Sequence, residues 1–197
     1  SISALTVGDI MVPRAQMDTI DLNDPLDDIL AAVVDTGHSR FPVHDGDRDN
    51  VVGILLAKDL LRVSGPGGFR LSDWLRPAVF IPESKRLNVL LREFRVSRNH
   101  MAIVVDEYGG VAGLITIEDV LEQIVGDIED EYDFDETEDN IRLDQFGRYR
   151  VKAQTELDDF NRAFGCRLDA ESVDTIGGLL LSRLGRVPRR NETVDLG

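Results

Sequence analysis

Two short stretches of this sequence end an apolar run at an aspartate, and either carboxylate could hold a ligand. Residues 53–59 read GILLAKD and residues 113–119 read GLITIED. A carboxylate at the junction of a strand and a helix can accept hydrogen bonds from the two hydroxyls of a ribose. The adjoining helix N-terminus offers N–H groups to a phosphate. Asp59 and Asp119 are therefore candidate nucleotide contacts, and Thr116 adds a hydroxyl.

The same pattern also has a purely structural interpretation. Thr116 followed three residues later by Asp119 resembles a capping box, in which the two residues satisfy each other's backbone N–H groups. The first stretch has Leu56 in place of the threonine, so it cannot form this box, yet it keeps Asp59. The helix dipole alone stabilises such an acid by only about 0.3–1 kcal/mol. The persistence of Asp59 favours a ligand role, and the missing hydroxyl predicts two unequal sites.

A helix is predicted for PLDDILAAVVDTG at 25–37, with Asp24 as its N-cap and Gly37 as its C-terminal stop. Its apolar face recurs later in the chain at the same spacing, which indicates an internal repeat of about 60 residues. The matching faces are Leu26, Ile29, Leu30 and Val33 in the first copy and Leu87, Leu90, Leu91 and Phe94 in the second. GDIMVP at 8–13 likewise resembles SDWLRP at 72–77.

The repeat predicts an α+β fold in which two β-α-β-β-α copies pack sheet to sheet, because one copy alone buries too little surface. We expect the first copy at 1–65, the second at 66–127, a solvated acidic linker at 128–140 and a small, partial α+β domain at 141–197. In that last domain, 149–154 reads as a strand, 155–165 as a capped helix and 174–185 as a second helix. NETVDLG at the end of the chain begins a further strand.

Composition excludes some classes of function. A net charge of −15 argues against nucleic-acid binding, which needs a positive surface. No apolar run approaches the roughly 20 residues that span a bilayer. Cys166 is the single cysteine, which fits a reducing, cytoplasmic compartment. The chain begins at Ser1 rather than at a methionine, which leaves room for an upstream membrane domain.

The repeat resembles a pair of CBS domains, and the whole chain resembles the HlyC/CorC family with its transporter-associated domain. The stretches that carry the resemblance are DIMVPRAQM, GHSRFPVHD, GILLAKDLL, ESKR, HMAIVVDEYGGVAGLITIEDVLEQIVGDIEDEYD and VDTIGGLL. The resemblance implies a regulatory homodimer that binds AMP or ATP, the latter with magnesium. It also implies a role in magnesium and cobalt efflux at the cytoplasmic face of the inner membrane, through a membrane partner or an upstream membrane domain.

The resemblance also implies which residues bind the nucleotide. Asp119 would hold the ribose and Thr116 a phosphate, while the adenine would lie against Thr19, Ile20, Arg40, Phe41 and Pro42. The related cleft would use Asp59 with Ile81, Met101 and Ala102. Leu56 departs from the family pattern, so this second cleft would bind more weakly, bind a nucleoside or stay empty. The apolar run containing Phe41 fits a core strand equally well.

No residue pattern predicts catalysis or a metal site. The acidic run at 127–139 lacks the glycine of a calcium-binding loop. His38, His44 and His100 have no ligand partners at suitable spacing and read as structural. Fold analogy suggests FAD in the C-terminal domain, although no residue supports it. The alternatives to nucleotide-dependent regulation are thus a flavin- or nucleotide-using enzyme and a nucleotide-free dimerisation scaffold.

Overall fold

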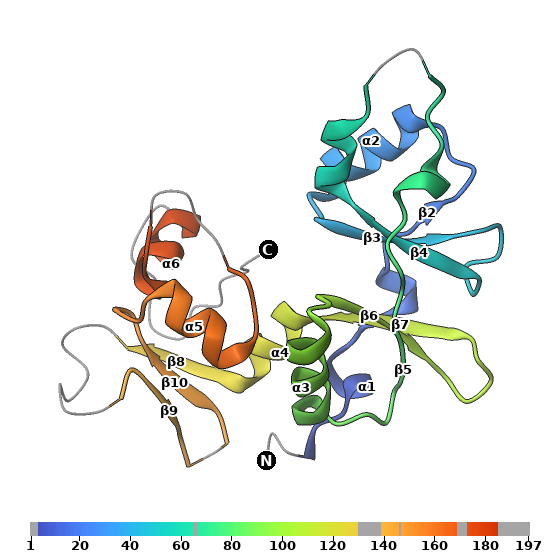
Figure 1. Ribbon diagram of the computed structural model, residues 1–197. Coiled ribbons are helices and arrows are strands. Elements are labelled where there is room, and N and C mark those ends of the chain that lie inside the picture. The colour runs from blue at the N-terminus through green and yellow to red at the C-terminus, as the bar shows by residue number, and fades with distance from the viewer. Residues whose placement is uncertain (1–3, 65–66, 130–138, 146, 169–172, 185–197) are drawn as a thin grey trace. The chain divides into compact units, whose positions relative to one another are not determined.

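The computed structural model describes residues 4–64, 67–129, 139–145, 147–168 and 173–184 (Figure 1). The chain forms two compact units, and the second repeat contributes to both. One unit contains Met11–Ser84 and Met101–Ile115, which are the first copy and the strands of the second. The other contains the described residues before Met11, the stretch Lys85–His100 and the described chain from Thr116 onward.

The first copy is a three-stranded sheet covered by helices. Its strands β2 (Ile20–Asp21), β3 (Arg40–His44) and β4 (Val51–Leu56) lie in that order, β2 parallel and β4 antiparallel to β3. Helix α2 (Leu26–Thr36) and the 3-10 helix η3 (Ala57–Arg62) lie on one face of this sheet (Figure 1). Ile29, Phe41 and Leu55 are buried in the core between them. Two short 3-10 helices, η2 (Arg14–Gln16) and η4 (Leu71–Trp74), flank the copy.

The strands of the second copy form a sheet that shares a core with the first. Strands β1 (Val12–Pro13), β7 (Val111–Thr116), β6 (Met101–Val105) and β5 (Phe80–Pro82) follow one another across it. The shared core takes buried residues from both copies, namely Met17, Val51 and Ile54 from the first and Met101, Ile103, Val111 and Leu114 from the second. The predicted packing of sheet against sheet is confirmed.

The other unit combines three helices of the repeat region with the C-terminal domain. The helices are α1 (Val7–Ile10), α3 (Leu87–Ser97) and α4 (Ile117–Ile124). The domain has a sheet of β8 (Val125–Glu129), β10 (Tyr149–Lys152) and β9 (Ile141–Leu143), with α5 (Leu157–Phe164) and α6 (Ile176–Leu184) on one face (Figure 1). The first residues of the predicted acidic linker therefore form a strand, because Ile128 and Glu129 pair with β10. Residues 130–138 and the predicted final strand at 191–197 lie outside the described residues.

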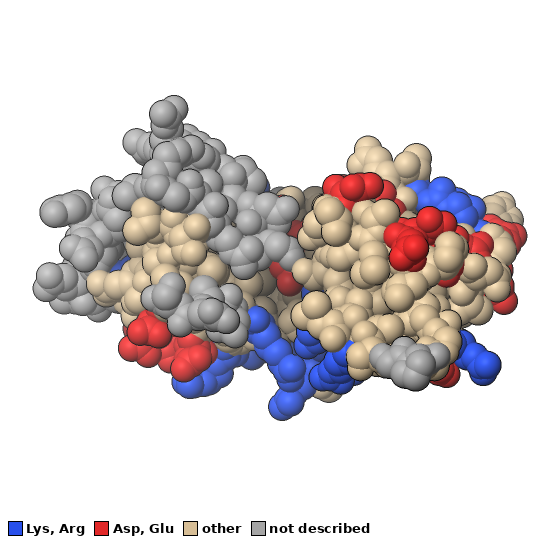
Figure 2. Space-filling model, turned by 90° about the horizontal axis from the view of Figure 1, so that it is seen from above, with Lys and Arg blue, Asp and Glu red and all other residues tan. Residues whose placement is uncertain are grey.

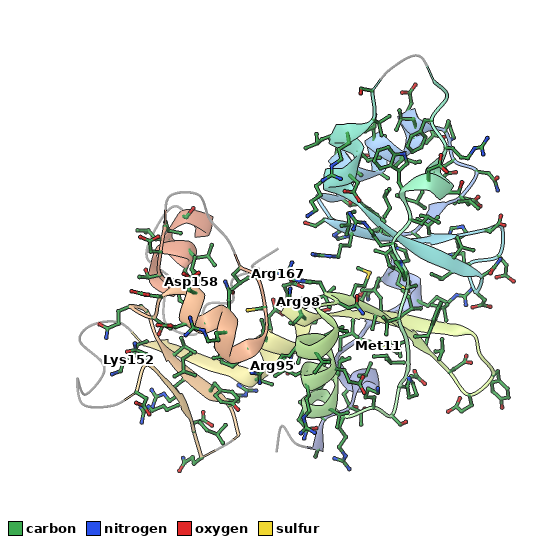
Figure 3. The ribbon with its side chains drawn as sticks, viewed as in Figure 1. Met11, Arg95, Arg98, Lys152, Asp158 and Arg167 are labelled. Atoms are coloured by element: carbon green, nitrogen blue, oxygen red, sulfur yellow. The ribbon has the colours of Figure 1, made fainter. Side chains whose placement is uncertain are left out.

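Helices α2 and α3 both end at a residue in the left-handed conformation, but the residue type differs between the two copies. In the first copy Gly37 ends α2 with φ of 68°, as predicted, and in the second Arg98 ends α3 with φ of 59°. Arg95 and Arg98 both come from this end of the helix in Figure 3. Gly165 approaches so closely that a methyl group added there would lie 1.9 Å from Cγ of Arg95. Only a glycine fits this contact between α3 and the C-terminal domain.

Two predicted helix starts are wrong, because neither α2 nor α5 has a side-chain cap at its N-terminus. Helix α2 begins at Leu26 with Pro25 as N-cap, since the Asp24 carboxylate accepts the N–H of Asp21 instead. Helix α5 begins at Leu157 and has no side-chain cap. The N–H of Leu157 donates instead to the carbonyl of Asp174, within a backbone bridge.

The predicted apolar faces of α2 and α3 are correct except at Leu30 and its counterpart Leu91. Ile29 is 1% exposed in α2, and Leu87, Leu90 and Phe94 are at most 2% exposed in α3. Leu30 is 40% exposed, because it lies at the edge of the apolar stripe rather than at its centre. Its counterpart Leu91 is only partly buried.

Asp49 joins the turn of the first copy to the start of β7. Its carboxylate accepts the N–H of Val111 at 2.9 Å and pairs with Arg14. The Val111 hydrogen bond, followed by the Arg14 guanidinium, lowers the pKa of Asp49 below its ordinary value of 3.8. A lowered pKa means that the carboxylate stabilises the fold above the unfolded-state value and that this stability is lost as the pH falls through the folded-state value.

Asp49→Asn should therefore lower the free energy of unfolding at neutral pH, and its difference from the native chain should shrink below pH 3.8. Urea unfolding at a series of pH values measures this difference. Asp35→Asn, at an exposed position in α2, is the control and should show no such trend. A difference for Asp49→Asn that does not change with pH would contradict the assignment.

Candidate functional site

Asp59, the first of the two strand-ending aspartates, is buried and neutralised by an arginine. It lies in η3, directly after β4, and is 2% exposed. Arg76 donates from Nε and Nη2 to both carboxylate oxygens, at 3.1–3.3 Å. The Arg76 side chain is half exposed. The carboxylate thus already has a cationic partner within the chain.

Arg76 is also fixed through its backbone. Its N–H and carbonyl both pair with Ile54 of β4, at 2.8 and 2.9 Å. A methyl group added at Gly53 would lie 2.9 Å from the Arg76 carbonyl and 2.9 Å from Cβ of Leu75. The space beside Gly53 admits the chain segment that carries Arg76.

A hollow of about 240 Å³ opens beside this ion pair. The hollow is lined by Asp59, Arg62, Asp73, Trp74, Leu75 and Arg76. The predicted partners Ile81, Met101 and Ala102 lie instead in β5 and β6 with exposures of 2%, 8% and 0%. The sequence held one signal for this ion pair that was missed. SDWLRP contains an arginine at the position where the matching stretch GDIMVP has a valine.

Asp119, the second aspartate, forms the capping box that the sequence predicts. Thr116 is the N-cap of α4, and its hydroxyl oxygen accepts the N–H of Asp119 at 3.2 Å. The Asp119 carboxylate accepts the N–H of Thr116 at 3.0 Å. Both side chains are half buried. In the first copy Leu56 provides no cap, and the corresponding segment is a 3-10 helix rather than an α-helix.

The register of the repeats places a valine where the first copy has Arg76. GDIMVP matches SDWLRP, so Val12 corresponds to Arg76. Val12 pairs with Leu114 in β7, and its carbonyl would lie 2.2 Å from a methyl group added at Gly113. The two segments thus approach equivalent glycines in the same way. They differ in charge, because a valine cannot neutralise a carboxylate.

The predicted adenine contacts lie next to one another within the first copy. Thr19 precedes β2, Ile20 begins it, and Arg40, Phe41 and Pro42 begin β3. Ile20 and Phe41 are in the core with exposures of 1% and 0%, so a ligand could reach only their backbones. Arg40 is half buried, and it lies on the other face of β3 from Phe41, since side chains alternate along a strand.

The three histidines and the single cysteine have ordinary structural surroundings. His38, His44 and His100 each lie within 4 Å of a single carboxylate, on Asp18, Asp21 and Glu118 respectively. Burial raises the pKa of the Cys166 thiol to about 11, so it is not a nucleophile at neutral pH. Within the described ranges, no three His, Cys, Asp or Glu side chains cluster as a metal site would require. On the face drawn in Figure 2, acidic side chains stand in separate groups, and some of these groups lie beside basic side chains.

Sequence comparison identifies the family of this chain. Residues 7–65 and 72–126 match the CBS-domain family, and residues 143–197 match the transporter associated domain. The magnesium and cobalt efflux protein CorC of Vibrio cholerae is 53% identical over 197 residues, which cover 99% of this chain and 67% of that protein. This chain belongs to the CorC family of CBS-domain proteins. It spans about two thirds of the length of the curated relatives it matches.

Solved structures agree with the CorC family fold. The CBS domain of a bacterial CNNM/CorC family Mg²⁺ transporter in complex with ATP is 40% identical, with a TM-score of 0.60 over 62% of this chain and 89% of that one. A CBS-domain pair with bound AMP from Klebsiella pneumoniae is 32% identical, with a TM-score of 0.56 over 62% of this chain and 99% of that one. Every helix in the described ranges of this CorC family chain is too short or too polar to span a bilayer.

The two partners of the first-copy ion pair should contribute unequally to stability. Arg76→Leu leaves a carboxylate that is 3% exposed without its cation, which we expect to cost about 3 kcal/mol of unfolding free energy. Asp59→Asn leaves a half-exposed guanidinium that water can solvate, so the loss of unfolding free energy should be only about 1 kcal/mol. Urea unfolding of both variants measures the difference. Equal costs, or a larger cost for Asp59→Asn, would contradict a buried ion pair.

Proposed function

We propose that this chain is a regulatory module that binds an adenine nucleotide through Thr116 and Asp119. The observation that carries the proposal is the pairing of a hydroxyl and a carboxylate at the N-terminus of α4, in a CBS pair. CBS structures that match most of this chain contain ATP or AMP. The ligand is AMP or ATP, the latter as its magnesium complex.

The capping box and a nucleotide-binding role are chemically compatible. The Thr116 hydroxyl uses an oxygen lone pair to accept the N–H of Asp119, so its proton remains available for a phosphate oxygen. A carboxylate has about four acceptor positions, and the hydrogen bond from the Thr116 N–H uses one of those on Asp119. The N-terminus of α4 adds favourable electrostatics for an anion. Thr19, Ile20, Arg40, Phe41 and Pro42 stay the predicted contacts for the adenine.

The proposed cellular role follows from the relatives. The CorC protein of Vibrio cholerae is named for magnesium and cobalt efflux. We propose that nucleotide binding by this chain regulates the movement of these ions across the inner membrane from its cytoplasmic face. The ion pathway itself would belong to a membrane segment upstream of the chain or to a partner protein.

A calorimetric titration with AMP, ADP and ATP, with and without magnesium, tests the binding proposal. We expect one nucleotide per chain. Asp119→Ala should weaken binding by roughly 10- to 100-fold, because hydrogen bonds to a charged group contribute about 1.5–3 kcal/mol. Thr116→Val should weaken it by less, because its hydrogen bond is neutral.

Thr175→Val is the matched control for lost capping. The Thr175 hydroxyl accepts the N–H of Gly178 at the start of α6, just as Thr116 does in α4. Both threonine variants should lose about 1 kcal/mol of stability through the lost cap, while only Thr116→Val should lose affinity. The proposal would be refuted if no nucleotide gave a heat of binding, or if Asp119→Ala and Thr116→Val left the affinity unchanged.

A homodimer is the proposed assembly. Three exposed aliphatic side chains of the first copy support it, with Leu30 at 40%, Val34 at 81% and Leu61 at 88% exposure. Exposed apolar side chains in one region are typical of interaction surfaces. Sedimentation equilibrium should give twice the chain mass for the native protein and one chain mass for Val34→Asp/Leu61→Asp. Val52→Asp, at a 41% exposed position in β4, is the control and should remain a dimer; a native monomer would refute this assembly.

A further inference from the structure

We infer that Arg76 closes the first copy to nucleotides and thereby limits the module to one nucleotide per chain. This inference rests on the proposed function, in which Asp119 holds a ribose. Asp59 holds the equivalent position in the repeat, and its carboxylate is already bonded on both oxygens by Arg76. Val12 stands in place of Arg76 in the register of the second copy, so this position supplies no cation to Asp119.

Chemistry favours the internal partner over a ribose. The two hydroxyls of a ribose are neutral donors, whereas the guanidinium is a cation that donates to both carboxylate oxygens from one planar group. A nucleotide would have to displace this cation from a carboxylate that is 3% exposed. The exchange replaces three charge-assisted hydrogen bonds with weaker ones at a site that still carries the negative charge.

Backbone contacts alone fix the position of Arg76. Its backbone pairs in both directions with Ile54, and Gly53 has no side chain that would keep the segment away. The guanidinium therefore starts from a fixed point close to Asp59 and loses little freedom on pairing. The hollow that remains, at about 240 Å³, is below the roughly 300–1,000 Å³ typical of ligand sites.

Leu56 is a second reason why the first copy should not bind a nucleotide. It replaces Thr116 of the second copy, so the first copy lacks the hydroxyl that would donate to a phosphate. Removing the guanidinium and restoring the hydroxyl gives the first copy the polar groups of the second. Leu56→Thr/Arg76→Val is therefore the variant expected to open the first site.

The experiment counts nucleotides per chain by calorimetry with magnesium ATP and with AMP. We expect one site in the native chain, one in Leu56→Thr, and two in Leu56→Thr/Arg76→Val. In an Asp119→Ala background, binding should be weakened by roughly 10- to 100-fold, and Leu56→Thr/Arg76→Val should then restore a tight site. Adding Asp59→Ala to that restored chain should abolish binding again.

Matched controls separate opening of the site from loss of charge or of fold. Arg62→Val removes the same charge from the same hollow without releasing Asp59, so it should still bind one nucleotide. Asp59→Asn/Arg76→Val removes both charges, so it should melt at a higher temperature than Arg76→Val and bind one nucleotide. If Leu56→Thr/Arg76→Val melts below the working temperature, the titration is repeated in the cold and followed by nucleotide-induced thermal shift.

The outcomes distinguish this inference from the function on which it rests. A native chain that binds no nucleotide refutes the proposed function, and the inference is then judged by whether Leu56→Thr/Arg76→Val gains a site that Asp59→Ala removes. A native chain with two sites overturns the inference. So does a folded Leu56→Thr/Arg76→Val chain with no added site, or an Arg76→Val chain that loses binding, since Arg76 would then be a phosphate ligand.

Discussion

A sheet that is apolar on both faces needs a partner on each, and this requirement organises the repeat region. Helices α2 and η3 cover one face of the first sheet, with Phe41 and Leu55 buried beneath them. The other face presents Val51 and Ile54, which the strands of the second copy cover with Ile103 and Leu114. One copy could not bury this second face by itself. Pairing of the two copies is therefore a condition of folding, whatever the ligand.

Pairing of copies leaves two equivalent positions that need not do the same work. Each copy ends a strand at an aspartate, and in each a glycine admits a neighbouring segment. Arg76 turns the first position into a buried ion pair that fixes the segment joining the copies. Thr116 turns the second into a capped helix start, and because its hydroxyl accepts a hydrogen bond there, its own proton can still be donated. The two positions have become one structural contact and one candidate binding site.

Local patterns in the sequence predict much of this arrangement. The capping box follows from Thr116 and Asp119, which are close in the chain, and the repeat with its sheet-to-sheet packing follows from matching stretches about 60 residues apart. The ion pair does not, because Arg76 follows Asp59 by 17 positions across a glycine-rich segment. Which side chain reaches Asp59 depends on how closely that segment approaches Gly53, and only the folded backbone shows this. The starts of α2 and α5 were mispredicted because groups at these starts make other hydrogen bonds. The Asp24 carboxylate accepts an N–H within its own loop, and the Leu157 N–H donates to the distant carbonyl of Asp174.

A crystal structure grown with saturating magnesium ATP tests the central claim most directly, because it shows both aspartates in one experiment. The account predicts a ribose on the Asp119 carboxylate and a phosphate near Thr116, with Arg76 still bonded to Asp59. A ribose on Asp59 with Arg76 displaced would contradict it, as would a nucleotide that contacts neither Thr116 nor Asp119.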